Sequence, residues 1–219
     1  MEGNMIIAID GPAGSGKGTI TKIIADRLGI VNIDTGAMYR CIALAFLRSN
    51  LSIEDKEGII ALTKKIKIEF GENGKVFLDK EEVSGLIRTK EISTVVSPIS
   101  SIVEVREEMV KLQRQLAEGC SIIMEGRDIT TVVFPNADYK FYLDATLEER
   151  ARRRFKQNQE AGIEMNYEEV LESIKKRDYN DMHKEVGSLT RTKDQIYIDS
   201  TNLTIEEVAQ EILKHIKER

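Results

Sequence analysis

The sequence predicts an α/β fold with a parallel sheet of about five strands. Short, β-rich apolar runs alternate with helical patterns along the 219 residues, and such alternation is typical of strands joined by crossover helices. A glycine-rich turn between the first strand and the first helix fits the same architecture. The length indicates one large domain, or one domain that carries an insertion.

The elements can be justified in chain order. Residues 5–9 (MIIAI) are continuously apolar and predict a strand buried on both faces, and residues 17–28 predict a helix that Gly29 ends. Residues 31–34 predict a second strand and residues 37–50 a second helix, followed by a long amphipathic helix near 105–116. Three more strands are predicted at residues 121–125, 139–143 and 195–199.

The last helix has the clearest pattern. A capping box of Thr204 and Glu207 precedes it. Six apolar residues then share one helical face: Ile205, Val208, Ala209, Ile212, Leu213 and Ile216.

One stretch interrupts the alternation of strands and helices. Residues 65–79 (KIKIEFGENGKVFLD) contain two alternating runs around Asn73-Gly74, which predicts a β-hairpin. Residues 60–95 are therefore interpreted as a small β-containing insert on the α/β body. A plain surface hairpin explains the same residues equally well.

Composition excludes several classes of protein. The chain has 32 basic and 37 acidic side chains and a net charge of −5, which argues against binding of nucleic-acid polymers. No apolar run approaches the 20 or so residues that span a membrane, and the first residues (MEGN) carry no secretory signal. Two cysteines cannot form a disulfide framework. With only two histidines and no Cys/His cluster in the sequence, neither zinc chemistry nor a histidine-based triad is expected. A cytoplasmic protein with reduced thiols is expected.

A phosphate-binding loop follows the first strand directly. The segment GPAGSGKGT matches G-x-x-x-x-G-K between a predicted strand and a predicted helix. The glycines let successive N–H groups face a phosphate, the helix N-terminus adds partial positive charge, and the lysine reaches the β- and γ-phosphates. The predicted ATP-binding residues are Gly11, Pro12, Ala13, Gly14, Ser15, Gly16, Lys17, Gly18 and Thr19.

The end of this loop marks a subclass. Gly18 stands where the standard motif has the Ser or Thr that holds Mg²⁺, and Thr19 follows it. Thr19 could ligate the ion directly, or the phosphates could hold a hydrated Mg²⁺ near Thr19 and Glu125 with no direct protein ligand. The GKGT ending resembles nucleoside monophosphate kinases, and the sequence has neither the N-K-x-D motif of GTPases nor the LSGGQ motif of ABC-type ATPases.

Arginines gather near predicted strand ends, where α/β sheets bind ligands. DTGAMYR follows the second strand, and EGRD follows the third. A basic run then follows a predicted capping box of Thr146 and Glu149. Any one of these arginines could be an ordinary surface ion pair, but three like charges on one helical face favour a polyanionic ligand. The run comprises Arg150, Arg152, Arg153, Arg154 and Lys156, with Arg150, Arg153 and Arg154 on one face.

These motifs together resemble the bacterial-type cytidylate kinases. IDGPAGSGKGT, DTGAMYR, VSGLIRT, EGRDITTVVFP, LDATLEERARRR and KKRDYND occur in the order and spacing of that family and cover nearly the whole chain. The resemblance implies a three-layer P-loop kinase fold with a core of residues 1–59 and 96–219. It also implies a CMP-binding insert at 60–95 and a helical lid at 150–165.

The resemblance also implies roles for individual residues. Lys17, Arg127, Arg153 and Arg154 would be catalytic, the last two as lid arginines. Ser97, Arg106 and Asp128 would recognise cytosine, Asp181 the ribose, and Arg40, Arg127 and Arg177 the acceptor phosphate. Thr35 and Lys184 complete the implied CMP-binding set, with Lys184 standing where the family usually has arginine.

The implied reaction moves the γ-phosphoryl group of ATP to CMP or dCMP with Mg²⁺ as cofactor, in a monomeric protein. One alternative is a P-loop kinase for UMP, AMP or a hydroxyl-bearing metabolite. A hydroxyl acceptor would need a carboxylate base, for which Asp34 is the best-placed residue. The other alternative is a nucleotide-binding module without catalytic turnover.

Overall fold

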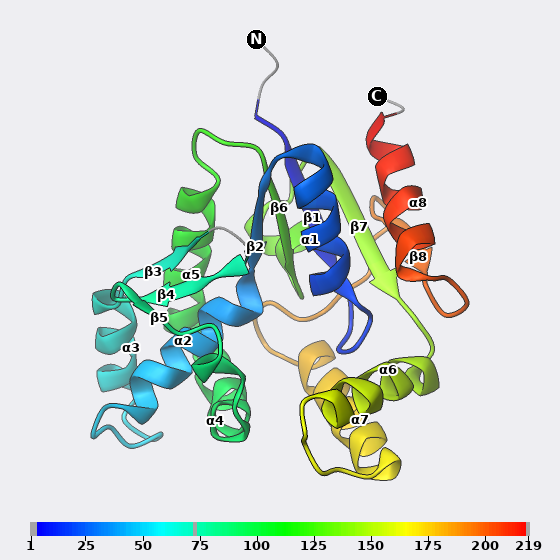
Figure 1. Ribbon diagram of the computed structural model, residues 1–219. Coiled ribbons are helices and arrows are strands. Elements are labelled where there is room, and N and C mark those ends of the chain that lie inside the picture. Colours follow the sequence, from blue (N-terminus) through cyan, green and yellow to red (C-terminus); the bar gives the residue numbers. More distant parts are fainter. Residues whose placement is uncertain (1–3, 72–73, 218–219) are drawn as a thin grey trace. The chain divides into compact units, whose positions relative to one another are not determined.

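The computed structural model describes residues 4–71 and 74–217 (Figure 1). The chain forms two compact units. The first contains the chain up to Val31 and from Cys120 onward, and the second is Asn32–Gly119.

The predicted five-stranded parallel sheet is present, and its strands β1, β6, β7 and β8 belong to the first unit. Its strand order is β2-β6-β1-β7-β8, so β1 is central and the direction of strand progression reverses around it. The β1 strand pairs in parallel with β6 and β7, and β7 pairs in parallel with β8. Ligands of such sheets bind beyond the carboxyl ends of the strands at the reversal point, and the GPAGSGKGT loop leaves β1 at that end. The strands are β1 (Ile6–Asp10), β2 (Val31–Asp34), β6 (Ile122–Gly126), β7 (Tyr139–Asp144) and β8 (Ile196–Asp199).

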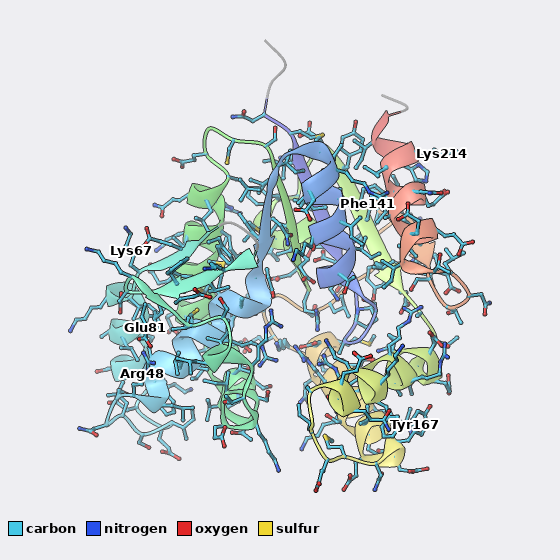
Figure 2. The ribbon with its side chains drawn as sticks, viewed as in Figure 1. Arg48, Lys67, Glu81, Phe141, Tyr167 and Lys214 are labelled. Carbon is cyan, nitrogen blue, oxygen red and sulfur yellow. The ribbon has the colours of Figure 1, made fainter. Side chains whose placement is uncertain are left out.

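Helices cover the sheet and bury its apolar side chains. Figure 1 shows α1 and α8 side by side, and their apolar residues join those of β1 and β7 in one core. Phe141 of β7, labelled in Figure 2, is fully buried in this cluster. The helices of the first unit are α1 (Lys17–Leu28), α6 (Leu147–Glu160), α7 (Tyr167–Met182) and α8 (Ile205–Lys217), with a short π-helical turn, η3 (Ile129–Val133).

The predicted signals at the ends of α1 and α8 are confirmed. Gly29 adopts a left-handed conformation with φ 65°, and its N–H donates to the carbonyl of Ala25. The Thr204–Glu207 capping box is complete, since each residue's side chain accepts the other's backbone N–H, at 3.2 and 2.8 Å.

The predicted capping box at the start of α6 is only half formed. Thr146 accepts the N–H of Glu149, but the Glu149 carboxylate binds Arg152 and Arg153 instead of returning to Thr146. The Thr146 N–H donates to Thr201 Oγ1 at 2.9 Å. The prediction was wrong here because charge-assisted bonds to two arginines are stronger than a bond to a neutral amide.

The second unit packs four helices with a small antiparallel sheet. The sheet order is β3-β4-β5, and Ile68 faces Leu78 across the first pair. This confirms the two strands of the predicted hairpin, whereas Asn73 of its predicted turn lies outside the described residues. The elements are α2 (Thr35–Leu47), α3 (Lys56–Lys65), β3 (Ile68–Phe70), β4 (Val76–Leu78), β5 (Glu81–Glu82), η2 (Leu86–Arg88), α4 (Lys90–Ser100) and α5 (Val103–Leu116).

Several of these elements differ from the sequence prediction. The α2 helix begins at Thr35 rather than residue 37, because the Asp34 carboxylate accepts the Ala37 N–H at 3.0 Å and caps it. Helices α3 and α4 were not predicted. Arg48, just after α2, holds β5 through a two-bond pair with Glu81 at 2.6 and 2.9 Å, and Figure 2 shows these two side chains meeting.

None of the helices within residues 4–71 and 74–217 combines the length and apolar character needed to cross a membrane.

The first unit's core yields a stability prediction. Phe141→Ala should lower the free energy of unfolding by about 3–5 kcal/mol, because it removes a buried ring and leaves a cavity. Urea unfolding followed by circular dichroism measures this change. Lys214→Ala, at an exposed position of α8, is the matched control and should change it by less than about 0.5 kcal/mol. Equal effects of the two substitutions would contradict the assignment of Phe141 to the core.

Candidate active site

The phosphate loop joins β1 to α1 and folds around its own lysine. Lys17, 5% exposed, is the first residue of α1. Its Nζ donates to the carbonyls of Gly11 and Pro12 at 2.8 and 2.9 Å and to Ser15 Oγ at 3.2 Å. The ammonium group therefore already lies inside the loop. A bound phosphate would replace the two carbonyls as its hydrogen-bond acceptor.

The pKa of the Lys17 ammonium group lies close to neutral pH. Burial lowers the pKa of its ammonium group to about 7, and Arg127 and Arg177 lower it as well, whereas Glu125 and Asp10 oppose the change. A phosphate in the loop would favour the charged form and raise the pKa. Because the charges of Arg127 and Arg177 act on this pKa, a second set of cations lies close to the loop.

Glu125 explains the glycine that interrupts the standard motif. A Cβ at position 18 would lie 2.8 Å from Glu125 Oε1, closer than such atoms approach. Glu125 lies at the carboxyl half of β6 and is 9% exposed. Gly18 therefore leaves room for a carboxylate beside the loop, where the standard motif would have a side-chain hydroxyl.

The second set of cations surrounds Asp181 of α7. Arg127 Nε donates to Asp181 Oδ2 at 2.7 Å, Lys184 Nζ lies 3.2 Å from Oδ1, and Arg177 Nε lies 3.9 Å from Oδ2. Burial favours the protonated acid, but Arg127, Lys184 and Arg177 outweigh it and lower the pKa of Asp181 to about 2. Four of the predicted CMP-binding residues thus form one cluster, with Asp181 as a permanent anion at its centre.

Arg127 and Asp128 are placed by the turn that follows β6. Asp128 is 7% exposed, and its carbonyl accepts the N–H groups of Val132 and Val133 at 2.8 and 3.2 Å. This π-helical turn directs the chain back after Gly126, and such turns are frequent at functional sites.

A buried carboxylate that the sequence analysis missed supports this turn. Asp10, the last residue of β1, is fully buried and accepts the N–H groups of Ile129 and Thr130 at 2.9 and 2.8 Å. It also accepts the Thr130 hydroxyl at 2.6 Å, and Thr130 Oγ1 accepts a bond from Gln195 Nε2 at 2.5 Å. Burial raises the pKa of Asp10 despite these bonds. An aspartate that ends a wholly apolar strand was the available signal.

Three arginines of the basic run on α6 are paired with carboxylates. Arg152 and Arg153 both bind Glu149, at 2.7 and 2.9 Å. Arg150 is 7% exposed and binds Asp178 at 2.5 Å. Acids from α7 and from one turn earlier on α6 therefore offset Arg150 and Arg153, two of the three cations predicted to share one helical face.

The two predicted lid arginines differ in what they contact. Arg153 donates to Ser200 Oγ and to the Ser200 carbonyl at 3.0 and 2.6 Å, and to the Ser15 carbonyl at 3.5 Å. In this structure it therefore joins the β8–α8 turn to the phosphate loop. Arg154 is half-buried on the same helix. Their role over a transferring phosphoryl group stays a prediction.

The remaining predicted CMP contacts lie in the second unit. Arg40 donates to the Ile87 carbonyl and Ser93 Oγ at 3.2 and 3.3 Å. Arg106 is 5% exposed, donates to the Ser100 carbonyl at 3.3 Å, and has its guanidinium 5.6 Å from the centre of the Tyr39 ring. Thr35 is buried at the start of α2, and Ser97 is exposed on α4.

A groove of about 570 Å³ lies in the first unit near the start of α6 and of α7. It is lined by Arg152, Tyr167 and the turn from Thr201 to Thr204, among others, and by none of the predicted ATP- or CMP-binding residues. It is therefore distinct from the predicted nucleotide contacts.

Over residues 4–71 and 74–217, the structure shows no group of three or more His, Cys, Asp or Glu side chains arranged to hold a metal ion. Of the two residues predicted near Mg²⁺, Thr19 ends the loop and Glu125 has its carboxylate against Gly18. A single carboxylate at this place suits Mg²⁺, which commonly keeps several waters and binds through one or two carboxylates together with substrate phosphates.

Comparison with known proteins gives consistent matches. The family model for cytidylate kinase matches residues 7–218. The cytidylate kinase of Caldanaerobacter subterraneus is 52% identical over 96% of this chain and 94% of its own length. The enzyme of the same name from Bacillus subtilis is 45% identical over 100% and 99%, respectively.

Solved structures support the fold alone. An uncharacterised protein from Eubacterium ventriosum aligns with a TM-score of 0.57 at 13% identity, covering 99% of this chain and 100% of that one. A shikimate kinase from Bacteroides thetaiotaomicron aligns with a TM-score of 0.50 at 14% identity, covering 97% and 98%. Since the family model spans nearly the whole sequence and the relatives match along almost their full lengths, the chain belongs to the cytidylate kinase family.

Proposed function

We propose that this protein transfers the γ-phosphoryl group of ATP to CMP or dCMP and releases ADP with CDP or dCDP. Family membership supports this activity. The observation that carries it is the proximity of two cation sets, because Arg127 and Arg177 lower the pKa of Lys17 in the phosphate loop. Hydrolysis of one nucleotide would need one such set, whereas transfer between two phosphates needs both.

The chemistry requires positioning rather than a proton acceptor. An acceptor phosphate has a second pKa near 6 and is already largely anionic at pH 7. The obstacle is the approach of two polyanions, since the loose transition state spreads negative charge over the equatorial oxygens. Lys17 and Arg127 would offset that charge from fixed positions. Arg153 and Arg154 would act from the proposed lid, residues 150–165, which would exclude water as it closes.

Mg²⁺ would accompany ATP and neutralise part of the phosphate charge. Glu125 and Thr19 are the residues that would hold the hydrated ion. The position of the Glu125 carboxylate against Gly18 supports this assignment.

CMP recognition is assigned to residues of both units. In the first unit these are Arg127, Asp128, Arg177, Asp181 and Lys184. In the second they are Thr35, Arg40, Ser97 and Arg106, and the 60–95 insert belongs to that unit. Lys184 stands where the family usually has arginine, and its Nζ lies 3.2 Å from Asp181 Oδ1. A lysine keeps the positive charge of an arginine but cannot make its two-pronged contact.

We also propose a monomer that works in the cytoplasm. The sequence has only two cysteines, and Cys41 is fully buried. Burial, and then Asp34, raise the pKa of the Cys41 thiol to about 12. A buried thiol that stays protonated, in a chain with too few cysteines for a disulfide framework, fits a reducing compartment.

A coupled assay of ADP release with CMP, dCMP, UMP and AMP tests the activity. CMP and dCMP should support rapid ADP release, and UMP and AMP much less. Preference for another acceptor would overturn the assignment to cytosine nucleotides, and no ADP with any acceptor would indicate a module without turnover.

The pKa of Lys17 predicts proton uptake on ATP binding. At pH 8 the free ammonium group, with a pKa of about 7, is mostly neutral, and bound phosphates should restore its charge. Calorimetry of MgATP binding in buffers of different ionisation enthalpy should therefore give uptake of close to one proton at pH 8 and almost none at pH 6. Lys17→Arg is the control, because its guanidinium stays charged at both pH values. Equal uptake by both proteins would contradict the prediction.

Substitution on α6 tests the lid. Arg154→Ala should lower kcat at least tenfold and leave the affinity for CMP nearly unchanged, because the lost charge acts on the phosphoryl group in the transition state. Arg152→Ala is the matched control on the same helix, since its side chain is 75% exposed. Steady-state kinetics with both substrates measures the difference. An unchanged kcat for Arg154→Ala would remove its assigned role.

Base recognition rests on Asp128. Asp128→Ala should erode discrimination between CMP and UMP by at least tenfold in kcat/KM, because a carboxylate that pairs with cytosine would be lost. Asp26→Ala, an exposed position on α1, provides the control. If the Asp128 variant rejected UMP and AMP as strongly as the unmodified enzyme, another residue would read the base.

A further inference from the structure

The tip of the phosphate loop is held from outside by a buried ion pair. Asp178 Oδ1 accepts the Ala13 N–H at 3.3 Å, and Arg150 Nη1 donates to the Ala13 carbonyl at 3.0 Å. The same Arg150 nitrogen binds Asp178 Oδ2 at 2.5 Å, and Arg150 Nε donates to the Ala145 carbonyl at 3.0 Å. Arg150 and Asp178 are only 7% and 8% exposed.

From this geometry we infer that Arg150 and Asp178 form a positioning pair that sets the backbone of the phosphate loop for ATP. This inference rests on the proposed function of the loop. Neither side chain is assigned a contact with the nucleotide. Their effect on ATP would pass through Ala13.

Peptide planarity explains how the pair acts on the loop. The Ala13 carbonyl and the Gly14 N–H belong to one flat unit and point in opposite directions. When Arg150 holds the carbonyl, the Gly14 N–H must face away from Arg150. A phosphate loop needs its N–H groups directed inward, so the pair fixes in advance an orientation that ATP would otherwise have to impose.

Helix α6 also packs directly against the phosphate loop. A Cβ at Gly14, where φ is +77°, would lie 3.0 Å from the Arg150 carbonyl oxygen and 3.2 Å from its Cβ. The first turn of α6 therefore approaches the loop through backbone as well as side chain. The same helix bears Arg153 and Arg154, and α7 bears Arg177, so the pair joins the loop to two helices that carry other cations of the site.

A stabilising role alone explains this pair poorly. Removing an arginine and an aspartate from water is costly, and replacing a buried pair with apolar residues is often neutral or stabilising. Removal of only one partner leaves the other charge buried and is destabilising. The two roles can therefore be separated by replacing both partners together.

The test compares Arg150→Met/Asp178→Leu with the unmodified enzyme. We expect a melting temperature equal to or above that of the parent, a Kd for MgATP at least tenfold higher by calorimetry, and a KM for CMP changed less than threefold. At saturating ATP, kcat should fall less than threefold. Arg152→Met is the matched control on α6 and should change none of these values.

A folded double variant that binds MgATP as tightly as the parent would overturn the inference. So would equal rises in both KM values, because these would indicate general loosening rather than an effect on the loop. If the double variant fails to fold, Arg150→Lys keeps the buried charge but loses the fork that spans Ala13 and Ala145. It should weaken MgATP binding at least threefold, and unchanged binding would likewise overturn the inference. Calorimetry needs no acceptor, so these outcomes remain distinct from failure of CMP as a substrate, which the ADP assay of the parent detects.

Discussion

The site depends on holding mutually repelling cations next to one loop before any substrate arrives. Lys17, Arg127 and Arg177 are close enough to one another that the two arginines lower the pKa of the lysine. The structure meets this difficulty with buried carboxylates. Asp181 lies within 4 Å of three cations, Asp178 binds Arg150, and Glu149 binds two arginines of α6.

These carboxylates hold the cations in place and offset their mutual repulsion, but each also competes with phosphate for its partner. With a pKa of about 2, Asp181 stays anionic at every working pH. An incoming phosphate would therefore share Arg127 with a neighbour that cannot be neutralised. The benefit is that little reorganisation of the protein is needed when negative charge develops, and fixed dipoles and charges of this kind are a principal source of catalysis. The lysine is the exception, because its partners in the structure are neutral carbonyls.

The sequence predicted features that depend on neighbouring residues better than features that depend on residues far apart in the chain. The strands, α1, α8 and the phosphate loop depend on local periodicity, caps and spacing, and these signals predicted them well. The failures involve competition between distant groups. Glu149 accepts bonds from Arg152 and Arg153 instead of completing the capping box with Thr146. Arg150 binds Asp178, 28 residues further on, which offsets part of the repulsion predicted on that helical face. Asp10 was missed because its three donors come from residues 129 and 130, which no local pattern connects with β1. The predicted roles of Ser97, Arg106 and the other CMP contacts come from resemblance and stay predictions.

The glycine between Lys17 and Thr19 can be related to the charges around the phosphate loop. In the standard motif a hydroxyl follows the lysine, whereas here the Glu125 carboxylate lies 2.8 Å from the place where that residue's Cβ would be. Any side chain at position 18 would push this carboxylate away from the loop. Glu125 raises the pKa of Lys17 against burial and two arginines, so its displacement would leave the lysine less often charged. The glycine therefore helps to keep the loop cationic, and a basic site can persist in a chain whose net charge is −5. A Ser or Thr at position 18 would therefore require the Glu125 side chain to shift, whereas Gly18 lets the carboxylate keep its place beside the loop.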